Sequence, residues 1–212
     1  MKTEKITYSL NRQLELTACE GHFAGRHSHT NYYLDITQIK HRHTQARLAA
    51  IELAQRYILM RNVDTIVCLD GSEVIGAFLA RHLAQKELLS LNSGKGIAVI
   101  TPETNTAGQL VFRDNLVPMV KDQDVLVLIS TVKSGRTLQA TLDCISYYGG
   151  RVQAVAAVFS AQEALGDTPI LSLFTPADLP DYMTAPPADC PLCAAGRKLD
   201  GLANSYGISR LP

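Results

Sequence analysis

The chain has 212 residues, enough for one domain with a small appendage and a substantial core. Lysine plus arginine equals aspartate plus glutamate at 20 each, and the resulting zero net charge does not favour nucleic acid or an anionic membrane as a general partner. No apolar run approaches the roughly 18 residues of a membrane span, and the polar N-terminus has no signal-peptide pattern. An odd count of five cysteines then favours a reducing cytoplasm over a disulfide framework.

The first distinctive segment, residues 21–37, is dense in polar and aromatic side chains. It holds three histidines, an arginine, two tyrosines and an aspartate. Tyr32 and Tyr33 fit two interpretations. They belong to an edge strand over residues 32–36 with alternate side chains packed inward, or they offer aromatic faces to a flat heterocycle. The histidines are expected mainly as polar surface residues.

Residues 44–61 show the clearest helical periodicity of the chain. The apolar residues that recur at helical spacing are Ala46, Ala49, Ala50, Leu53, Ala54, Tyr57 and Ile58. This stripe predicts a helix packed on the core, with no chemistry implied.

A buried strand is predicted over residues 65–69, followed by the turn Asp70-Gly71-Ser72 and a helix from Glu73 to about residue 90. Ser72 is suited to cap this helix, and Gly71 permits a close backbone approach. Alone, this pattern is also that of an ordinary turn between a strand and a helix. A third strand, 96–100, leads into a long connection over residues 101–119.

The most informative stretch, residues 125–138, combines a strand, a short loop and the start of a helix. Residues 125–129 are apolar and predict a strand buried on both faces, and Leu138 begins a helical stripe. The unpaired N–H groups at the start of a helix attract anions. Lys133, Ser134 and Thr137 add an ammonium group and two hydroxyls to this predicted anion site.

Further strands are expected over residues 152–159 and 170–174. Strands that alternate with helices at this spacing predict an α/β fold with a doubly wound parallel sheet and helices on both faces. Ligands of such sheets bind at the carboxyl ends of the strands, where the turns after residues 69 and 129 fall.

The tail contains Cys190-Pro-Leu-Cys193, which is typical of half of a zinc site. Cys19 and His22 have the spacing to supply two further ligands, with His27 and His29 as alternatives. A redox pair and a reduced turn without metal are the competing interpretations.

Over about residues 21–160 the chain resembles the type I phosphoribosyltransferases, and in particular their orotate branch. The strand, loop and helix of residues 125–138 carry this resemblance, together with Gly25, Ser28 and Asp35 around the two tyrosines. It implies a site for phosphoribosyl pyrophosphate (PRPP) with Mg²⁺. The implied 5-phosphate residues are Ser130, Thr131, Lys133, Ser134, Gly135, Arg136 and Thr137; Asp70, Gly71 and Ser72 receive the pyrophosphate, and Ser28, Tyr32 and Tyr33 contact the base.

The sequence departs from the resembled pattern in two places. Ile129 and Ser130 replace two adjacent acids that hold the ribose hydroxyls, and Ser130 is expected to keep one weaker hydrogen bond. The connection over residues 101–119 has no cation before Arg113, where the family has a mobile loop with several.

Two functions follow: an orotate-type transferase that releases pyrophosphate, or a non-catalytic sensor that binds PRPP or a nucleotide.

The resemblance also implies a division of the chain and an assembly. Residues 1–43 form a hood segment over the base, residues 44–175 form the α/β core, and residues 176–212 form a tail with the Cys-x-x-Cys motif. The N- and C-terminal segments are expected to make up a small hood beside the core. A homodimer is expected.

Overall fold

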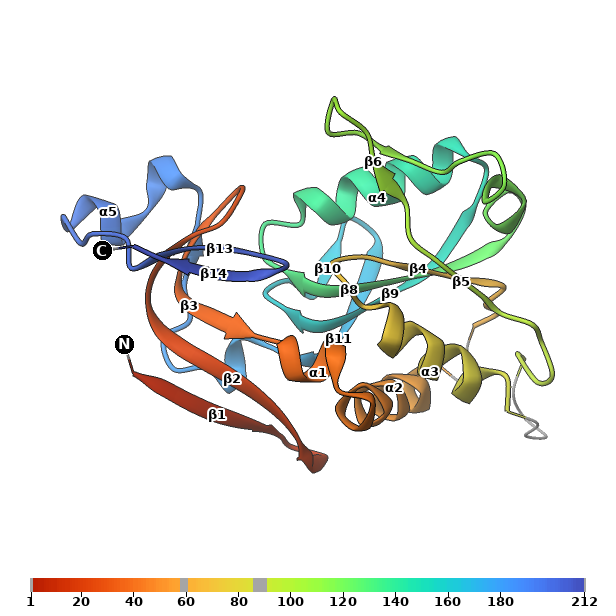
Figure 1. Ribbon diagram of the computed structural model, residues 1–212, viewed down its shortest axis with the longest axis horizontal. Helices are drawn as coiled ribbons and strands as arrows, with labels where there is room; N and C mark the ends of the chain where they lie inside the picture. The colour runs from red at the N-terminus through yellow and green to blue at the C-terminus, as the bar shows by residue number, and fades with distance from the viewer. Residues whose placement is uncertain (1, 58–60, 86–90, 212) are drawn as a thin grey trace.

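The computed structural model describes residues 2–57, 61–85 and 91–211, which form two six-stranded sheets and a two-stranded hairpin. The larger sheet has the order β10-β11-β9-β8-β4-β5, and all pairs except β10–β11 are parallel (Figure 1). Its strands are β4 (Thr65–Cys68), β5 (Ala98–Ile100), β8 (Asp124–Val132), β9 (Arg151–Ser160), β10 (Ala164–Leu165) and β11 (Thr168–Phe174).

Helices cover both faces of this sheet, as predicted. One face packs against α2 (His43–Tyr57) and α3 (Glu73–Leu83), and the other against α4 (Arg136–Tyr147) (Figure 1). Side chains along β8 alternate between the two cores: Leu126 and Leu128 face α2 and α3, whereas Val127 and its alternate neighbours face α4. The uninterrupted apolar run of residues 125–129 is therefore explained by burial on both faces.

The order of the parallel strands places a switch point between β4 and β8. The chain leaves β4 through α3 to reach β5 on one side, and leaves β8 through α4 to reach β9 on the other. The two connections therefore diverge, which opens a crevice at the carboxyl ends of β4 and β8.

The second sheet, which we call the hood, joins the two ends of the chain. It has the order β12-β3-β2-β13-β14, with β1 paired to β2. The strands are β1 (Thr3–Tyr8), β2 (Asn11–Ala24), β3 (His29–Asp35), β12 (Thr184–Ala185), β13 (Gly201–Asn204) and β14 (Gly207–Arg210). The N-terminal segment and the tail thus share one sheet (Figure 1).

The hood packs directly on the core domain. Leu14 and Leu16 of β2 are buried in the same apolar cluster as Leu53 of α2, and the ring of Tyr8 meets that of Phe174 edge-on at 5.8 Å. The short helix α1 (Thr37–His41) connects β3 to α2, and α5 (Pro191–Ala194) lies in the tail.

Several predicted boundaries change. The helix expected to run from residue 73 to about 90 ends at Leu83. The helix predicted over residues 44–61 is described as far as Tyr57. Residues 58–60 and 86–90 lie outside the described parts of the chain. The capping role expected for Ser72 is wrong, because its hydroxyl donates a 3.0 Å hydrogen bond to the Leu128 carbonyl instead.

The connection over residues 101–119 has structure of its own. A hairpin of β6 (Glu103–Thr104) and β7 (Leu110–Val111) is followed by a 3₁₀ turn at Val117–Met119; two similar turns, Pro176–Asp178 and Pro187–Asp189, occur in the tail. Among the described residues, no helix combines the length and apolar character needed to cross a membrane.

Candidate functional site

Two turns meet at the switch point, and hydrogen bonds hold them together. The turn after β4 is bound to the end of β8 by a 2.8 Å bond from the Leu69 N–H to the Leu128 carbonyl. The Ser130 hydroxyl donates a 3.1 Å bond to the Asp70 carbonyl. The predicted pyrophosphate turn and the predicted phosphate loop are therefore neighbours in one rigid arrangement.

The turn after β4 has an unusual backbone. Asp70 and Gly71 both have positive φ values, 57° and 76°. Two consecutive residues in this region turn the chain sharply, and the conformation is costly for aspartate. Such outliers cluster at ligand sites, which supports the assignment of this turn to a binding site.

The phosphate loop also depends on a left-handed residue. Gly135, at the start of α4, has a φ of 75°. A Cβ atom there would lie 2.9 Å from Oε1 of Gln162 and 3.0 Å from Cδ1 of Leu165, so the position requires glycine both for its backbone angle and for space. On either side of Gly135, the side chains of Ser134, Arg136 and Thr137 are exposed at the N-terminal end of the three-turn helix α4.

Lys133 is the charged group at the centre of the loop. Burial lowers the pKa of its ammonium group to about 8. No carboxylate or hydrogen-bond acceptor of residues 2–57, 61–85 or 91–211 is paired with this ammonium. A desolvated cation without a counter-ion is a strong point of attraction for an anionic ligand.

Two predicted ligand groups, Ser130 and Ser72, are committed to the fold, and so is Ile129, which stands where the resembled family has an acid. Ile129 is 1% exposed in the core under α4, so it cannot reach a ribose. The buried hydroxyl of Ser130 donates its hydrogen bond to the Asp70 carbonyl. This placement does not fit the two contacts expected of Ser130, one with a ribose hydroxyl and one with the 5-phosphate. Ser72 is buried and bonded to Leu128, which leaves only its neighbours Asp70 and Gly71 open in that turn.

Positive charge approaches the phosphate loop from the hood. The turn between β2 and β3 carries Arg26, which is exposed, and His27, which is partly buried. Burial lowers the pKa of His27, and the nearby charges of Arg136 and Arg26 lower it further. Arg26 and Arg136 thus create a cationic rim beside the start of α4, and the lowered pKa of His27 favours its uncharged form.

The β6–β7 hairpin closes this rim but adds no free cation. Arg113 binds Glu103 through two hydrogen bonds of 2.6 and 2.7 Å, so its charge is neutralised within the hairpin. A Cβ atom on Gly108 at the hairpin turn would lie 3.5 Å from Nη2 of Arg26. The hairpin turn therefore lies next to Arg26 of the hood, and Arg26 is the unneutralised arginine at this place.

The residues expected to contact a base are buried. Tyr32 stacks on Tyr182 with ring centroids 6.4 Å apart, and Tyr33 packs against Phe23. Ser28 is also buried. The two tyrosines lie in β3, which pairs with β2 and β12, and they are buried together with Leu34, so β3 differs from an edge strand with alternate side chains packed inward. A contact of Tyr32 or Tyr33 with a base does not fit the burial of the two rings.

A turn of the hood that carries an aromatic residue lies beside the turn after β4. Lys40 on α1 donates to the carbonyls of Asp70 at 2.8 Å and Ser205 at 2.6 Å, which fastens the β13–β14 turn of the hood to the turn after β4. The next residue, Tyr206, is 95% exposed. The same turn points toward the core sheet in Figure 1.

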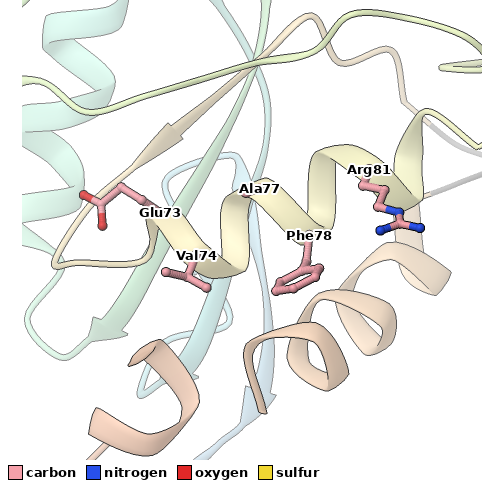
Figure 2. A pocket seen from close by; sticks show the side chains of 5 residues that line it. All are labelled: Glu73, Val74, Ala77, Phe78 and Arg81. Atoms are coloured by element: carbon pink, nitrogen blue, oxygen red, sulfur yellow. The ribbon is translucent and has the colours of Figure 1, made fainter. Parts of the chain in front are cut away.

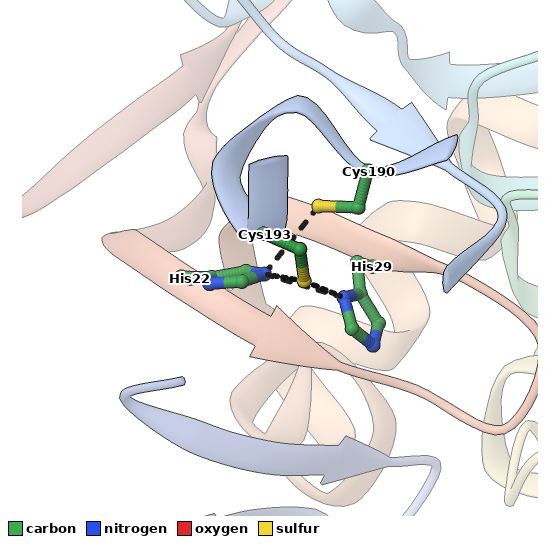
Figure 3. Close-up of side chains that lie close together, drawn as sticks. All are labelled: His22, His29, Cys190 and Cys193. Carbon is green, nitrogen blue, oxygen red and sulfur yellow. Dashed lines mark hydrogen bonds between the residues drawn. The ribbon is translucent and has the colours of Figure 1, made fainter. Parts of the chain in front are cut away.

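The predicted metal ligands are only partly brought together. His22, Cys190 and Cys193 lie in one cluster, and the fourth member is His29 (Figure 3). Cys19 lies outside it, with its sulfur 3.5 Å from the Thr3 hydroxyl. Cys19 packs instead beside Phe23 and Tyr33 of the hood.

A separate hollow lies along α3 and is lined by apolar groups between one acid and one arginine. Figure 2 shows its lining residues, Glu73, Val74, Ala77, Phe78 and Arg81. It follows the flank of the helix instead of the end of the sheet, and it lacks the cations found around the two turns.

Three residues of the crevice were missed from the sequence. The burial of Lys40 and the reach of Arg26 across to another segment have no local sequence signal. Tyr206 had one, because Asn204 to Gly207 has the composition of a hairpin turn, and the Asn204 side chain accepts from the N–H groups of Tyr206 and Gly207.

Comparison with known proteins supports the fold. The orotate phosphoribosyltransferase of Mycobacterium tuberculosis H37Rv, solved with PRPP, is 19% identical and aligns over 69% of this chain and 82% of its own, with a TM-score of 0.50. The adenine phosphoribosyltransferase of Thermoanaerobacter pseudethanolicus is 15% identical over 81% and 94% of the two chains, with a TM-score of 0.51. No protein-family model matches the chain.

A sequence relative has a different role. The transcriptional regulator GfcR of Haloquadratum walsbyi is 29% identical over 134 residues, which make up 60% of this chain and 58% of the regulator. The match thus spans little more than half of that protein. The comparisons together show that this chain has the type I phosphoribosyltransferase fold.

The lowered pKa of Lys133 predicts how the site responds to pH. The Lys133 ammonium, with a pKa of about 8, loses its proton as the pH rises above that pKa. The phosphate of ribose 5-phosphate is already dianionic above about pH 7. Affinity for ribose 5-phosphate should therefore fall up to tenfold for each pH unit above about pH 8. Calorimetric titrations from about pH 7 to pH 9.5 test this. Lys133→Arg should bind with a flat profile because arginine stays charged, and Lys121→Ala, an exposed control, should retain the wild-type slope. A flat wild-type profile would show that Lys133 does not contact the phosphate.

Proposed function

We propose that this protein is a phosphoribosyltransferase that binds PRPP at the switch point between β4 and β8 and transfers its ribose 5-phosphate to a nitrogenous base. The observation that carries the proposal is the pairing of two turns at that point: a glycine-bearing helix start with an unpaired lysine, and a turn with two positive φ values. The first is suited to a phosphate and the second to a pyrophosphate.

The 5-phosphate is assigned to the loop over residues 131–137. Backbone N–H groups at the start of α4 point out of the helix end, and Lys133 supplies the charge. Ser134 and Thr137 are exposed beside them and can donate hydroxyl hydrogens to phosphate oxygens. Ser130, which the sequence had included, supports the neighbouring turn instead.

The pyrophosphate is assigned to the turn at Asp70 and Gly71, facing the cationic rim. Cleavage of PRPP leaves negative charge on the departing pyrophosphate, and cations fixed beforehand around it lower the barrier. In this chain the arginines come from the hood and from α4, since the hairpin arginine is paired with Glu103. Arg26 and Arg136 thus take the part that a cationic mobile loop would have.

Asp70 also fits a divalent cation. Burial raises the pKa of its carboxyl group, Lys40 counteracts this, and none of the described side chains donates a hydrogen bond to the carboxylate. One protein carboxylate together with substrate phosphates is a common set of Mg²⁺ ligands. When bound, Mg²⁺ would neutralise part of the pyrophosphate charge. The protein side chains position the substrate around it.

The ribose has fewer contacts than the sequence resemblance implies. Transfer passes through a ribose with cationic character and needs mainly positioning and charge stabilisation, so it does not require an acid–base pair. With Ile129 and Ser130 buried, no carboxylate follows β8 to hold the ribose hydroxyls. A slow reaction is the expected consequence.

The base is assigned to the space beneath Tyr206. Its exposed ring follows Ser205, whose carbonyl shares the Lys40 ammonium with Asp70. Stacking of a heterocycle on an aromatic side chain is worth about 1–3 kcal/mol. The choice of orotate and the homodimer come from the resemblance alone, and the cytoplasmic location comes from the cysteine count and the polar N-terminus.

A second candidate is a sensor that binds PRPP or a nucleotide without turnover. The burial of Ile129 and the commitment of Ser130 favour it, because both remove groups that would act on the ribose and neither alters the phosphate loop. The similarity to a transcriptional regulator is consistent with this role.

Titration with PRPP and Mg²⁺, followed by addition of orotate, uracil, adenine or guanine, separates the two candidates. Binding heat should be present in the wild type and in Lys121→Ala, and should be lost in Lys133→Ala and reduced in Ser134→Ala. Release of pyrophosphate with one base would establish the transferase, and binding without release would establish the sensor. If neither PRPP nor a nucleoside monophosphate binds the wild type, both candidates are wrong.

Substitution of Tyr206 tests the base site. Tyr206→Ala should weaken the base about 5- to 100-fold, measured as KM or as Kd in the presence of PRPP, and should leave PRPP binding unchanged. Tyr206→Phe should retain most of the affinity because it keeps the ring. Tyr147→Ala, a tyrosine that is 84% exposed at the end of α4, is the matched control and should have no effect. Equal base affinity in Tyr206→Ala and the wild type would rule out stacking on this ring.

A further inference from the structure

The hood contains a cluster of four metal-ligating side chains that the proposed reaction does not use. His22 comes from β2, His29 from β3, and Cys190 and Cys193 from the tail at α5 (Figure 3). One nitrogen or sulfur atom of each residue faces a common point, and all four atoms lie within 4.8 Å of one another. Residues 170 positions apart in the chain thus converge on a single small volume.

Four of the six distances in the cluster match the edges of a tetrahedron around a metal ion. Bonds of about 2.0–2.3 Å from zinc to nitrogen and sulfur place neighbouring ligands roughly 3.3–3.8 Å apart. Here Nε2 of His22 is 3.2 Å from Nδ1 of His29, 3.5 Å from the Cys190 sulfur and 3.6 Å from the Cys193 sulfur. Nδ1 of His29 is 3.3 Å from the Cys193 sulfur.

His22 is oriented for coordination by groups outside the cluster. Its Nδ1 donates to the Arg197 carbonyl at 2.8 Å, which leaves the lone pair of Nε2 directed at the other three ligands. The bulge between Glu20 and Phe23 turns this side chain out of the regular alternation of β2. The bulge needs Gly21, where a Cβ atom would lie 2.6 Å from the Phe23 ring.

The two cysteines are held by a tight turn of the tail. The Ala194 N–H donates to the Cys190 carbonyl, and the Gly196 N–H donates to the Cys193 carbonyl. Gly196 has a φ of 72°, which glycine adopts easily. This backbone presents both sulfurs on one side, toward the two histidines (Figure 3).

We propose that His22, His29, Cys190 and Cys193 bind one Zn²⁺ ion that fastens the tail to the N-terminal strands of the hood. Two nitrogen and two thiol ligands in a tetrahedron favour zinc over hard cations such as Mg²⁺. Binding releases two thiol protons to solvent and forms two zinc–sulfur bonds, with no redox change. Four protein ligands leave no open position, so the ion is structural.

The site has a consequence for the rest of the hood. The tail segment after Cys193 leads through Arg197 and Asp200 into the β13–β14 hairpin. The Asp200 carboxylate accepts a hydrogen bond from the His22 N–H, and the Asp200 N–H donates one to the His22 carbonyl. Zinc would therefore fix the origin of the hairpin whose turn reaches Lys40. This inference depends only on the hood and stands whether or not the protein binds PRPP.

The test is the metal content and cobalt spectrum of the full-length protein, purified under reducing conditions. Wild type should contain about one zinc per chain, and Co²⁺ substitution should give the thiolate charge-transfer band and the intense d–d bands of a tetrahedral site. Cys193→Ser and His29→Ala should lose both signals. Cys19→Ser and Cys144→Ser should keep both, because neither sulfur belongs to the cluster.

Stability gives a second measurement that does not rely on the variants folding. Removal of zinc from the wild type with a chelator should lower its thermal midpoint, and added zinc should restore it. Absence of zinc together with failure to take up Co²⁺ would overturn the proposal, as would a Cys190–Cys193 disulfide that persists in reductant. Metal uptake that survives both Cys193→Ser and Cys190→Ser would also overturn it.

Discussion

The candidate site depends on the parallel pairing of β4 with β8. Because this pairing lies at the switch point, the two strands deliver their following turns to one place, and the Leu128 and Asp70 carbonyls accept the hydrogen bonds that join those turns. Serine hydroxyls that could have faced a ligand stabilise this junction instead.

Charge is distributed around the crevice in an uncommon way. The hairpin over residues 103–111 neutralises its own arginine, whereas Arg26 of the hood and Arg136 of α4 stand near the phosphate loop. Lys40 fastens the hood to the pyrophosphate turn from the other side. The crevice is therefore lined by groups of both the core and the hood.

The sequence predicted the fold well because its signals were local. The buried run at residues 125–129, the glycine at 135 and the apolar stripe of α2 each determine their own structure. The hood was harder, since its sheet is assembled from segments at both ends of the chain, and no local pattern pairs Gly201 with Phe23. The same limit applies at the site: the burial of Tyr32, Tyr33, Ser72 and Ser130, and the convergence of His29 with the two cysteines, depend on contacts between distant segments.

Hydrogen exchange of the backbone, with and without PRPP and Mg²⁺, tests most directly whether the two turns form one binding site. The account predicts that the amides of residues 69–73 and of residues 133–139 become protected together, because both sets of N–H groups donate to the same ligand. Amides of the exposed 3₁₀ turn at Val117–Met119 should not change. Protection of only one turn, or of neither, would contradict the assignment of this crevice to PRPP.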